Sequence, residues 1–425
     1  MHRVAMPDGH DVSEPGSTPI ISRRFGALAY KEFRLLWAGL LVSNTGSWMA
    51  TLAQGWLVVE LSPNQTLAPF YLGLVGFVRA IPVFLLSGVA GTLADRVDRR
   101  RLLIISQSAL GISALALAIL SQLHVVKIWH VLVLAAVSAA GLSFDAPTRQ
   151  SLVPHLVPKG QLMNAIGLNS AAFNGPAIIG PALGGILVST VGVADCFYIN
   201  ALSYGAVLLA LGAISPKPPL LDVERRGIWH EMLDGLRYVR SQPAILAIFA
   251  LAVLMSIVAR PYIQLMPAFA KGVIHRGADG LGILMAVSGA GALGGSIATA
   301  FIGAQHRRGI LMLSSGIASG AALFCFALTR NVLSASCALV VLGAAIMLFM
   351  GMTNTLLQTH TPLVMRGRVM SLYTMIFLGF MPLGAWLLGS AATLTSLPST
   401  LAIAGALVLV ASAAMTRFIA LRDLA

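Results

Sequence analysis

The stretch GTLADRVDRRRLL at residues 91–103 separates two long apolar runs and decides how this chain folds. Gly91 allows two helix ends to approach closely because it has no side chain. Asp95 can cap a helix end or pair with an arginine. The arginines that follow form a basic cluster of the kind that stays on the cytoplasmic side of a membrane. The stretch therefore predicts a short charged turn between two membrane-spanning helices.

The composition also indicates a membrane protein. Of the 425 residues, 57% are hydrophobic and 10% are charged, whereas soluble domains contain about 25% charged residues. A membrane-spanning helix needs roughly 20 apolar residues. We therefore predict an all-α integral membrane protein with twelve transmembrane helices, at about residues 34–58, 69–93, 102–123, 128–147, 164–190, 195–214, 243–269, 279–303, 309–329, 331–355, 369–390 and 397–416.

The positive charges are distributed unequally between the two sides of these spans. Placing the N-terminus in the cytoplasm puts most of the 28 lysines and arginines on that side and four on the other: Lys127, Lys271, Arg276 and Arg330. Because cytoplasmic loops carry an excess of Lys and Arg, we expect both termini in the cytoplasm. The basic residues would also contact anionic lipids of the bilayer. A net charge of +13 without an aromatic-studded basic domain does not indicate nucleic-acid binding.

The chain is predicted to divide into two halves of six spans. Apolar residues recur at helical spacing over 229–239, which predicts an amphipathic helix on the membrane surface between the halves. The expected units are a disordered cytoplasmic tail at 1–29, an N-terminal half at 30–214, a cytoplasmic linker at 215–242 and a C-terminal half at 243–425.

The two halves contain matching segments. Residues 159–164 match residues 366–371, and the same offset of 207 relates residues 98–101 to 305–308. Several matches at one offset indicate an internal repeat. With an even number of spans in each half, both repeats enter the membrane from the same side, so they are parallel repeats.

These motifs resemble the major facilitator superfamily of secondary transporters. Its loop between helices 2 and 3 has the pattern Gly-x-Leu-Ala-Asp-Arg-x-Gly-Arg-Lys/Arg, and residues 91–100 follow it except that Asp98 replaces a glycine. An acid at this position is frequent in the branch that exports drugs and siderophores. The resemblance covers about residues 30–420. It implies a substrate site near the midplane between the halves, in a monomer of the bacterial inner (plasma) membrane.

The resemblance implies a gating role for the charged loop. Asp145 and Arg149 flank Pro147, where we expect the fourth span to end because proline stops a helix. The two can pair with each other or with charges of the neighbouring loop, and a static surface salt bridge is the alternative. The residues of the predicted gate are Gly91, Asp95, Arg96, Arg99, Arg100, Asp145 and Arg149.

The fifth span contains the sequence NGPAIIGPALGG. It resembles the Gly-Pro-x-x-Gly-Gly element of superfamily antiporters, which is associated with export. A kinked helix that packs closely through Gly180 and Gly184 explains the same residues without specifying a direction of transport. The residues of this antiporter-like element are Gly175, Pro176, Gly180, Pro181, Gly184 and Gly185.

Charged side chains within the spans are the strongest candidates for substrate or proton binding. Placing a charge at the bilayer centre costs roughly 2.5–3.5 kcal/mol on insertion scales. Arg79 lies near the midplane, where it could bind an anionic group, modulate a proton carrier or hold helix carbonyls. Arg260 lies nearer the outer surface, and its long side chain is expected to extend so that the guanidinium reaches water. Neutral residues that could line a cavity or hydrogen-bond between helices are Asn44, Gln54, Asn169, Asn174, Asn200, Asn354 and Gln358.

The sequence contains no phosphate-binding Gly-x-x-x-x-Gly-Lys-Ser/Thr motif and no spaced metal ligands, so we expect no enzyme activity, cofactor or metal. Proton coupling would use Asp145, Glu60 or Asp195, or an unfamiliar route. We predict a proton-driven antiporter that exports small amphipathic molecules, such as drugs or siderophores, by rocker-switch alternating access. An importer by symport or uniport, and a non-transporting sensor or scaffold on the same fold, are the alternatives.

Overall fold

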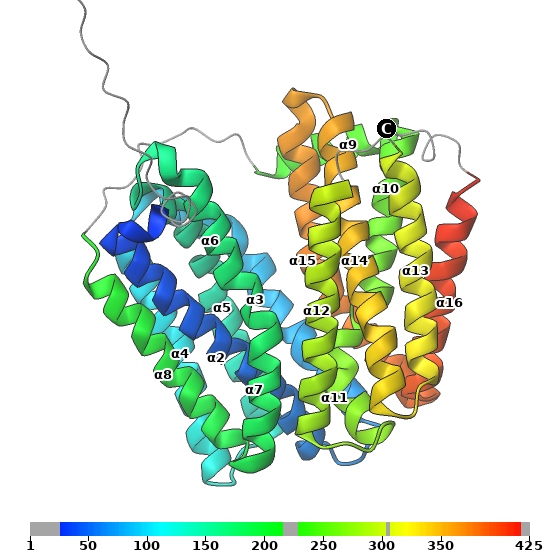
Figure 1. Ribbon diagram of the computed structural model, residues 1–425, viewed down its shortest axis with the longest axis horizontal. Coiled ribbons are helices and arrows are strands. Elements are labelled where there is room, and N and C mark those ends of the chain that lie inside the picture. The colour runs from blue at the N-terminus through cyan, green and yellow to red at the C-terminus, as the bar shows by residue number, and fades with distance from the viewer. Residues whose placement is uncertain (1–25, 216–227, 303–306, 418–425) are drawn as a thin grey trace, which may run out of the picture.

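A computed structural model describes residues 26–215, 228–302 and 307–417, and every regular element in these ranges is a helix. The helices form two bundles that stand side by side (Figure 1). The first bundle consists of α2 (Lys31–Leu61), α3 (Ala68–Arg96), α4 (Arg99–Gln122), α5 (Ile128–Leu152), α6 (Leu162–Asn174) with α7 (Pro176–Thr190), and α8 (Val193–Gly212). Short 3-10 turns are η1 (Gly26–Ala29), η2 (Val153–His155) and η3 (Lys159–Gln161).

The second bundle follows the connecting helix α9 (Ile228–Ser241). Its first span is built from three pieces in succession, α10 (Pro243–Leu254), the π-helical turn η4 (Met255–Ala259) and α11 (Tyr262–Gly272). The other five are α12 (Ala278–Ile302), α13 (Arg308–Leu328), α14 (Val332–His360), α15 (Leu363–Leu394) and α16 (Leu397–Met415).

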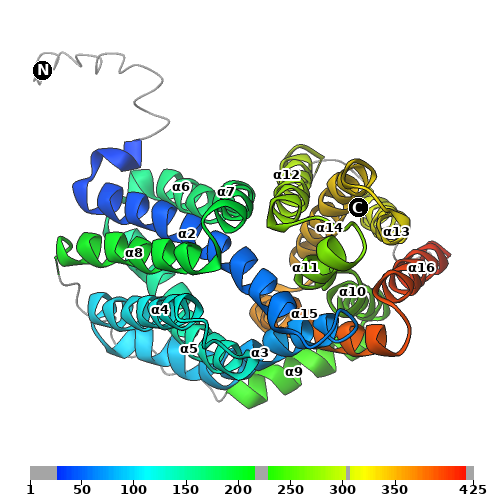
Figure 2. The same cartoon turned by 90° about the horizontal axis from the view of Figure 1, so that it is seen from below.

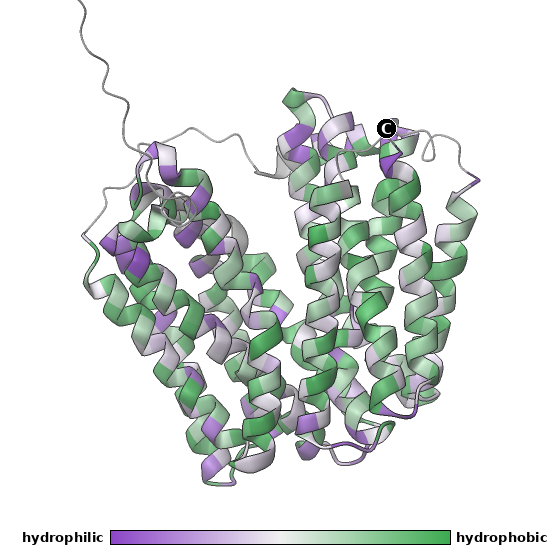
Figure 3. Ribbon diagram, viewed as in Figure 1, coloured by the Kyte–Doolittle hydropathy of each residue, from purple (hydrophilic) through white to green (hydrophobic). Residues whose placement is uncertain are grey.

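The surface of the bundles suits a lipid environment. Figure 3 shows most hydrophilic residues near the ends of the helices and a mainly hydrophobic middle. Leu202 and Leu209 on α8 are 76% and 79% exposed, as expected for side chains that face lipid rather than water. Within the described ranges, eleven spans are long and apolar enough to cross a membrane by length and composition.

The twelfth span is α2, which has 31 residues but carries polar side chains along its length, among them Asn44, Ser47 and Gln54. It lies within its bundle against α6, α7 and α8, as Figure 2 shows. Since neighbouring helices cover much of it, α2 tolerates polar residues that a lipid-facing helix excludes. The predicted architecture of twelve transmembrane helices in two six-helix halves is confirmed.

Two spans that the sequence predicts as continuous helices are interrupted. α6 ends at Asn174 and α7 begins at Pro176, because the proline has no N–H to bond the carbonyl of Ala172. The π-helical turn η4 interrupts the other span just before Pro261. The predicted helix end at Pro147 is wrong, since α5 continues through this residue to Leu152. A proline inside a helix removes one backbone hydrogen bond and can kink the helix without ending it.

The halves contact each other closely on the side of the molecule away from the described chain ends. A Cβ at Gly73 of α3 would lie 2.4 Å from the carbonyl oxygen of Ala385 on α15. On the other seam, a Cβ at Gly282 of α12 would lie 2.8 Å from the carbonyl oxygen of Pro181 on α7. The absence of a side chain therefore lets backbone meet backbone. Toward the face where the described chain begins and ends, the bundles diverge (Figure 1).

Helix α9 packs against the beginning of α15. Arg368 Nη1 lies 3.1 Å from Asp234 Oδ2, and Val239 is 2% exposed. The opposite side of α9 carries Leu233 and Leu236, which are 59% and 48% exposed. A helix is thus present where the amphipathic segment 229–239 predicts one. The Asp234–Arg368 ion pair and the buried Val239 attach it to the second bundle.

Candidate functional site

A cavity of about 640 Å³ lies between the two halves. Its walls come from α3 and α5 of the first half and from α11 and α15 of the second. Gly367, Ser371 and Thr374, on the first turns of α15, line it and are exposed. The cavity therefore opens toward the face at which the described chain begins and ends. We call it the central cavity.

A second cavity of about 340 Å³ lies inside the first half. We call it the N-half cavity. It is rich in polar side chains, and Arg79 and Leu142 line it as well as the central cavity. The polar residues that line it are Asn44, Ser47, Thr51, Gln54, Arg79, Ser113, Ser138, Asn200 and Tyr204.

Arg79 is the one charged residue among the described residues that line these two cavities. It is half-buried, and no hydrogen bond or ion pair joins it to another residue in the part of the chain that the structure describes. The expectation that Arg79 holds helix carbonyls is therefore not supported by a bond. A charge at the bilayer centre costs roughly 2.5–3.5 kcal/mol on insertion scales. We therefore expect water or a ligand in the cavity to solvate the guanidinium.

The second half contains a cavity of its own, which is lined by fewer polar residues than the N-half cavity. A cavity of about 540 Å³ between α12, α14 and α15 is lined by Asn354 and Thr374. Gln358 Nε2 donates to Asn354 Oδ1 over 2.6 Å, so these two predicted candidates bind each other. Because Thr374 also lines the central cavity, the two spaces adjoin at this residue.

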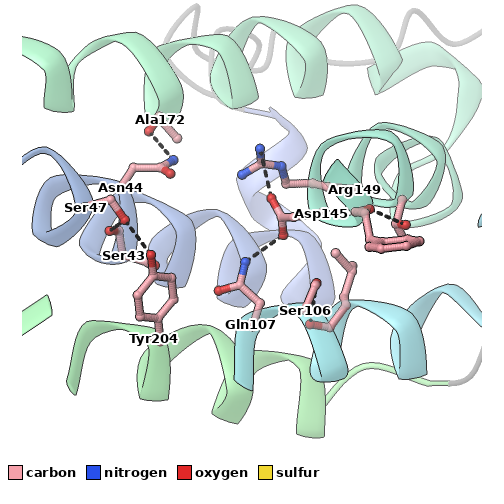
Figure 4. A network of polar contacts seen from close by, with 12 residues as sticks. Ser43, Asn44, Ser47, Ser106, Gln107, Asp145, Arg149, Ala172 and Tyr204 are labelled. Carbon is pink, nitrogen blue, oxygen red and sulfur yellow. Dashed lines mark hydrogen bonds and ion pairs between the residues drawn. The ribbon is translucent and has the colours of Figure 1, made fainter. Parts of the chain in front are cut away.

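Asp145 and Arg149 form a buried ion pair on successive turns of α5 (Figure 4). Arg149 Nη2 lies 3.3 Å from Asp145 Oδ2, and the side chains are 8% and 4% exposed. Gln107 of α4 donates through Nε2 to Asp145 Oδ1 over 2.6 Å, and the ring of Phe173 lies 5.3 Å from the Arg149 guanidinium. Removing one charge of such a pair leaves the other uncompensated, at roughly 3–5 kcal/mol. This group is a buried pair rather than a surface salt bridge.

The other residues of the predicted gate lie at the α3–α4 turn, which is shorter than the sequence suggests. α3 continues to Arg96, and Val97 and Asp98 alone separate it from α4. Asp98 Oδ1 accepts from the N–H of Arg100 and caps α4.

Arg100 does not join the pair on α5. Its Nε donates to the carbonyl of Leu211 over 2.6 Å and its Nη2 to that of Gly212 over 3.0 Å, at the end of α8. Arg99 is fully buried. The surroundings of Gly91 and the side chains of Asp95 and Arg96 lie outside what the structure describes.

Asn44 has a defined structural partner. Its Nδ2 donates to the carbonyl of Ala172 over 2.9 Å, and Ala172 is the residue four positions before Pro176. A helical N–H would normally bond this carbonyl, and the proline lacks it. The α2 side chain therefore replaces the missing backbone donor. Nearby, Ser47 Oγ and Tyr204 Oη lie 3.0 Å apart, which links α2 to α8 (Figure 4).

The remaining neutral candidates separate into two groups. Gln54 and the buried Asn200 line the N-half cavity. Asn174 is exposed and donates to the carbonyl of Ser170 on its own helix, and Asn169 lines none of the cavities described above.

The antiporter-like element on α6 and α7 packs in two directions. A Cβ at Gly180 would lie 2.5 Å from Trp48 Cβ on α2, and Gly184 faces Met49 on the same helix. Gly185 and the carbonyl of Pro181 instead meet Gly282 on α12, in the other half. The Gly180–Gly184 spacing does provide close helix packing, and the next glycine belongs to the seam between the halves.

Arg260 is not positioned as the sequence predicts. Its Nη1 donates to the carbonyl of Phe377 on α15 over 2.6 Å, and its Cζ lies 3.9 Å above the Phe377 ring. The expected extension to the outer surface is therefore wrong, because a carbonyl and an aromatic face within the bundle bind the guanidinium.

Sequence reasoning missed Gln107 and Gln264, a glutamine of α11 that lines the central cavity and has a buried Oε1 without a hydrogen-bond partner. Their polarity inside apolar runs was the available signal.

The family model described as transmembrane secretion effector matches residues 22–424. The chain belongs to this family. The predicted membership of the major facilitator superfamily is thereby confirmed, and the chain is a multi-pass membrane transporter.

The chain is similar to bacterial transporters, and its fold is similar to that of solved transporter structures. It is 28% identical over 301 residues to the enterobactin exporter of Citrobacter koseri, covering 71% of this chain and 72% of that protein. It is 25% identical over 372 residues to the staphyloferrin A transporter of Staphylococcus aureus, covering 85% and 89%. A bacterial homologue of the lysosomal transporter Spinster, solved inward-facing and unoccupied, has a TM-score of 0.68 at 15% identity and covers 96% of this chain and 98% of that one. This last likeness shows the fold alone.

Proposed function

We propose that this transporter exports small amphipathic molecules, such as drugs or siderophores, by rocker-switch alternating access. The observation that carries the proposal is the central cavity, which opens toward the face of the described chain ends and is closed on the other face by glycine seams. A substrate bound there changes sides when the seams separate and the opposite ends of the bundles meet. The moving units are the halves 30–214 and 243–425, joined by the linker 215–242 of a single monomer.

The loop charges support an orientation. Lys and Arg concentrate on the side of the described chain ends, so this face is cytoplasmic in the bacterial inner membrane. The substrate then enters the central cavity from the cytoplasm. A relative named as an enterobactin exporter favours outward movement, as does the antiporter-like element from Gly175 to Gly185.

We assign the coupling proton to Asp145. Its carboxylate is buried, accepts from Gln107 and neutralises Arg149. Protonation would remove the negative charge and leave the Arg149 guanidinium uncompensated in a buried position, which favours a conformation that hydrates or pairs it differently. The proton thus biases one of two arrangements. The α3–α4 turn, with Gly91, Asp95, Arg96, Arg99 and Arg100, is the adjacent gate in this proposal.

Transport in proteoliposomes with a defined orientation tests direction and coupling together. Ethidium and dansyl-labelled dyes would be loaded as a panel, with and without an imposed pH gradient. We expect dye to move from the cytoplasmic side of the protein to its outer side. The rate of this movement should increase when the pH gradient drives protons in the opposite direction. Accumulation driven with the proton flow would instead establish a symporter, and an absence of saturable flux for every dye would favour a sensor or scaffold.

The orientation has its own test. Single cysteines at Thr66 and Ser396, which are exposed on the proposed outer face, should react with an impermeant thiol reagent added to intact cells. Single cysteines at Val97 and Ser241 should react after the membrane is opened. The reverse pattern would contradict the proposed orientation.

A further inference from the structure

We propose that the transported molecules are amphipathic organic anions, with the anionic group bound by Arg79 and the apolar body in the central cavity. This inference deepens the proposed function and rests on it, because it assigns a substrate class to the same site.

The charges around the two cavities favour an anion. Arg79 lines both cavities, and no carboxylate lines either of them among the described residues. The guanidinium has no hydrogen bond or ion pair to another described residue, so its donors point to no fixed counter-ion. A cationic substrate would meet this charge without compensation, whereas a carboxylate, sulfonate or phosphate would supply it.

The N-half cavity offers further donors for an anionic group. Gln54 lines it and makes no hydrogen bond to another residue in the described part of the chain. Several hydroxyl groups nearby are already used within helices, since Thr51 donates to Ser47 and Ser113 donates to Ala109. Arg79 and Gln54 are therefore among the side-chain donors left for a ligand, and Arg79 is the charged one among them.

The central cavity supplies the apolar surface. Val83 and Phe84 line it from α3, and Met370 and Met375 line it from α15. Its volume of about 640 Å³ is within the usual range for small-molecule sites, roughly 300–1,000 Å³. Methionine adapts to ligands of different shape. A ligand with one anionic end and one apolar end would therefore contact both halves at once, with Gln264 reaching it from α11.

The test compares three probes that share one apolar body. Dansylglycine carries a carboxylate, dansylamide is neutral and dansylcadaverine carries an amine. Fluorescence titration of the full-length protein in lipid nanodiscs should give a dissociation constant for dansylglycine about tenfold or more below those of the other two. This comparison needs no variant, so it survives a failure of Arg79 variants to fold.

The variants then assign the selectivity to Arg79. Arg79→Gln should abolish the preference for dansylglycine, and Arg79→Lys should retain part of it, because the charge remains without the forked geometry. Arg330→Gln is the matched control, since Arg330 is exposed and donates to carbonyls of its own turn. Its probe preference should equal that of the wild type.

The outcomes separate this inference from the proposed function. Equal affinity for the three probes, or an unchanged preference in folded Arg79→Gln, would overturn the inference even if all three probes are transported. Anion-selective binding that depends on Arg79 would support the inference even if no probe crosses the membrane. The absence of flux would in that case contradict the proposed export function instead.

Discussion

The two halves share one fold but use charge differently. In the first half, Asp145 and Arg149 form a buried pair with Gln107, and Arg79 faces two cavities without a bonded partner in the described residues. In the second half, the guanidinium of Arg260 binds a carbonyl and an aromatic ring. The Arg260 charge is thus bonded within its own bundle, whereas the Arg79 charge faces the central cavity and the N-half cavity.

This difference suggests a division of labour between the repeats. A charge that must change partners or protonation during a cycle cannot be fixed by rigid packing. In the proposed mechanism, the first half carries the groups that respond to protons and substrate, and the second half supplies the opposite wall of the central cavity and a surface for the seams.

The largest effect is expected from Asp145→Asn. The amide keeps the shape of the side chain but cannot exchange a proton, so flux driven by a pH gradient should fall to the level of empty liposomes. Gln107 and Arg149 variants would disturb packing as well, which makes the isosteric change the sharper test. Protein amount and thermal stability are the controls. A folded Asp145→Asn protein that still responds to the gradient would move coupling to Glu60 or Asp195.

The next largest effect is expected at the seam that joins the halves. Gly282→Leu places a side chain where a Cβ already lies 2.8 Å from the Pro181 carbonyl oxygen, and overpacking of this kind costs roughly 1–3 kcal/mol. The closed seam should lose population, and flux should fall about tenfold. Gly294→Leu on the same helix is the control, because nothing lies within 4 Å of its Cβ position. Equal flux in the two variants would mean that the seam does not move.

A smaller effect is expected at Arg260. Arg260→Gln keeps a donor for the Phe377 carbonyl and loses the cation over the ring, so the midpoint of thermal unfolding should fall while flux changes by less than about threefold. The acceleration by a pH gradient should persist. Loss of that acceleration in a stable Arg260→Gln protein would show that both halves carry coupling charges.

The smallest effect is expected for Asn44, and a double-mutant cycle isolates it. Asn44→Ala leaves the Ala172 carbonyl without its donor, which should lower the free energy of unfolding by about 1–3 kcal/mol. Pro176→Ala restores a backbone N–H to this carbonyl, so Asn44→Ala should cost less in that background. Unfolding in detergent gives the four values. Additive costs would mean that Asn44 does not act for the missing donor.

Much of the fold follows from the sequence because lipid imposes long apolar helices, and eleven spans in the described ranges are recognisable by length and hydropathy alone. The details that escaped depend on contacts between distant segments. Pro147 does not end α5. The Asn44 side chain donates to the Ala172 carbonyl, which has no backbone donor because Pro176 lacks an N–H. Sequence spacing brought Asp145 and Arg149 together correctly, since a pair four residues apart is adjacent on a helix.

The position of Arg260 could not be predicted for the same reason. Its partner is Phe377, which lies 117 residues away in the sequence, and nothing local to Arg260 distinguishes a bonded guanidinium from one that extends to the surface. Gly185 and Gly282 likewise meet only because two bundles pack together. The glycines were visible, but their assignment to the seam between the halves required the fold.

Distances between spin labels on both faces test alternating access most directly. One label pair joins Met163 and Val364, which are 81% and 83% exposed near the face of the chain ends, and the other joins Val191 and Leu333, which are 55% and 77% exposed near the opposite face. Exposed Cys325 and Cys337 would first be replaced by serine. Comparing the wild type with Asp145→Asn, we expect the first distance to shorten as the second lengthens. Two distances that stay constant, or that change in the same direction, would contradict alternating access between these halves.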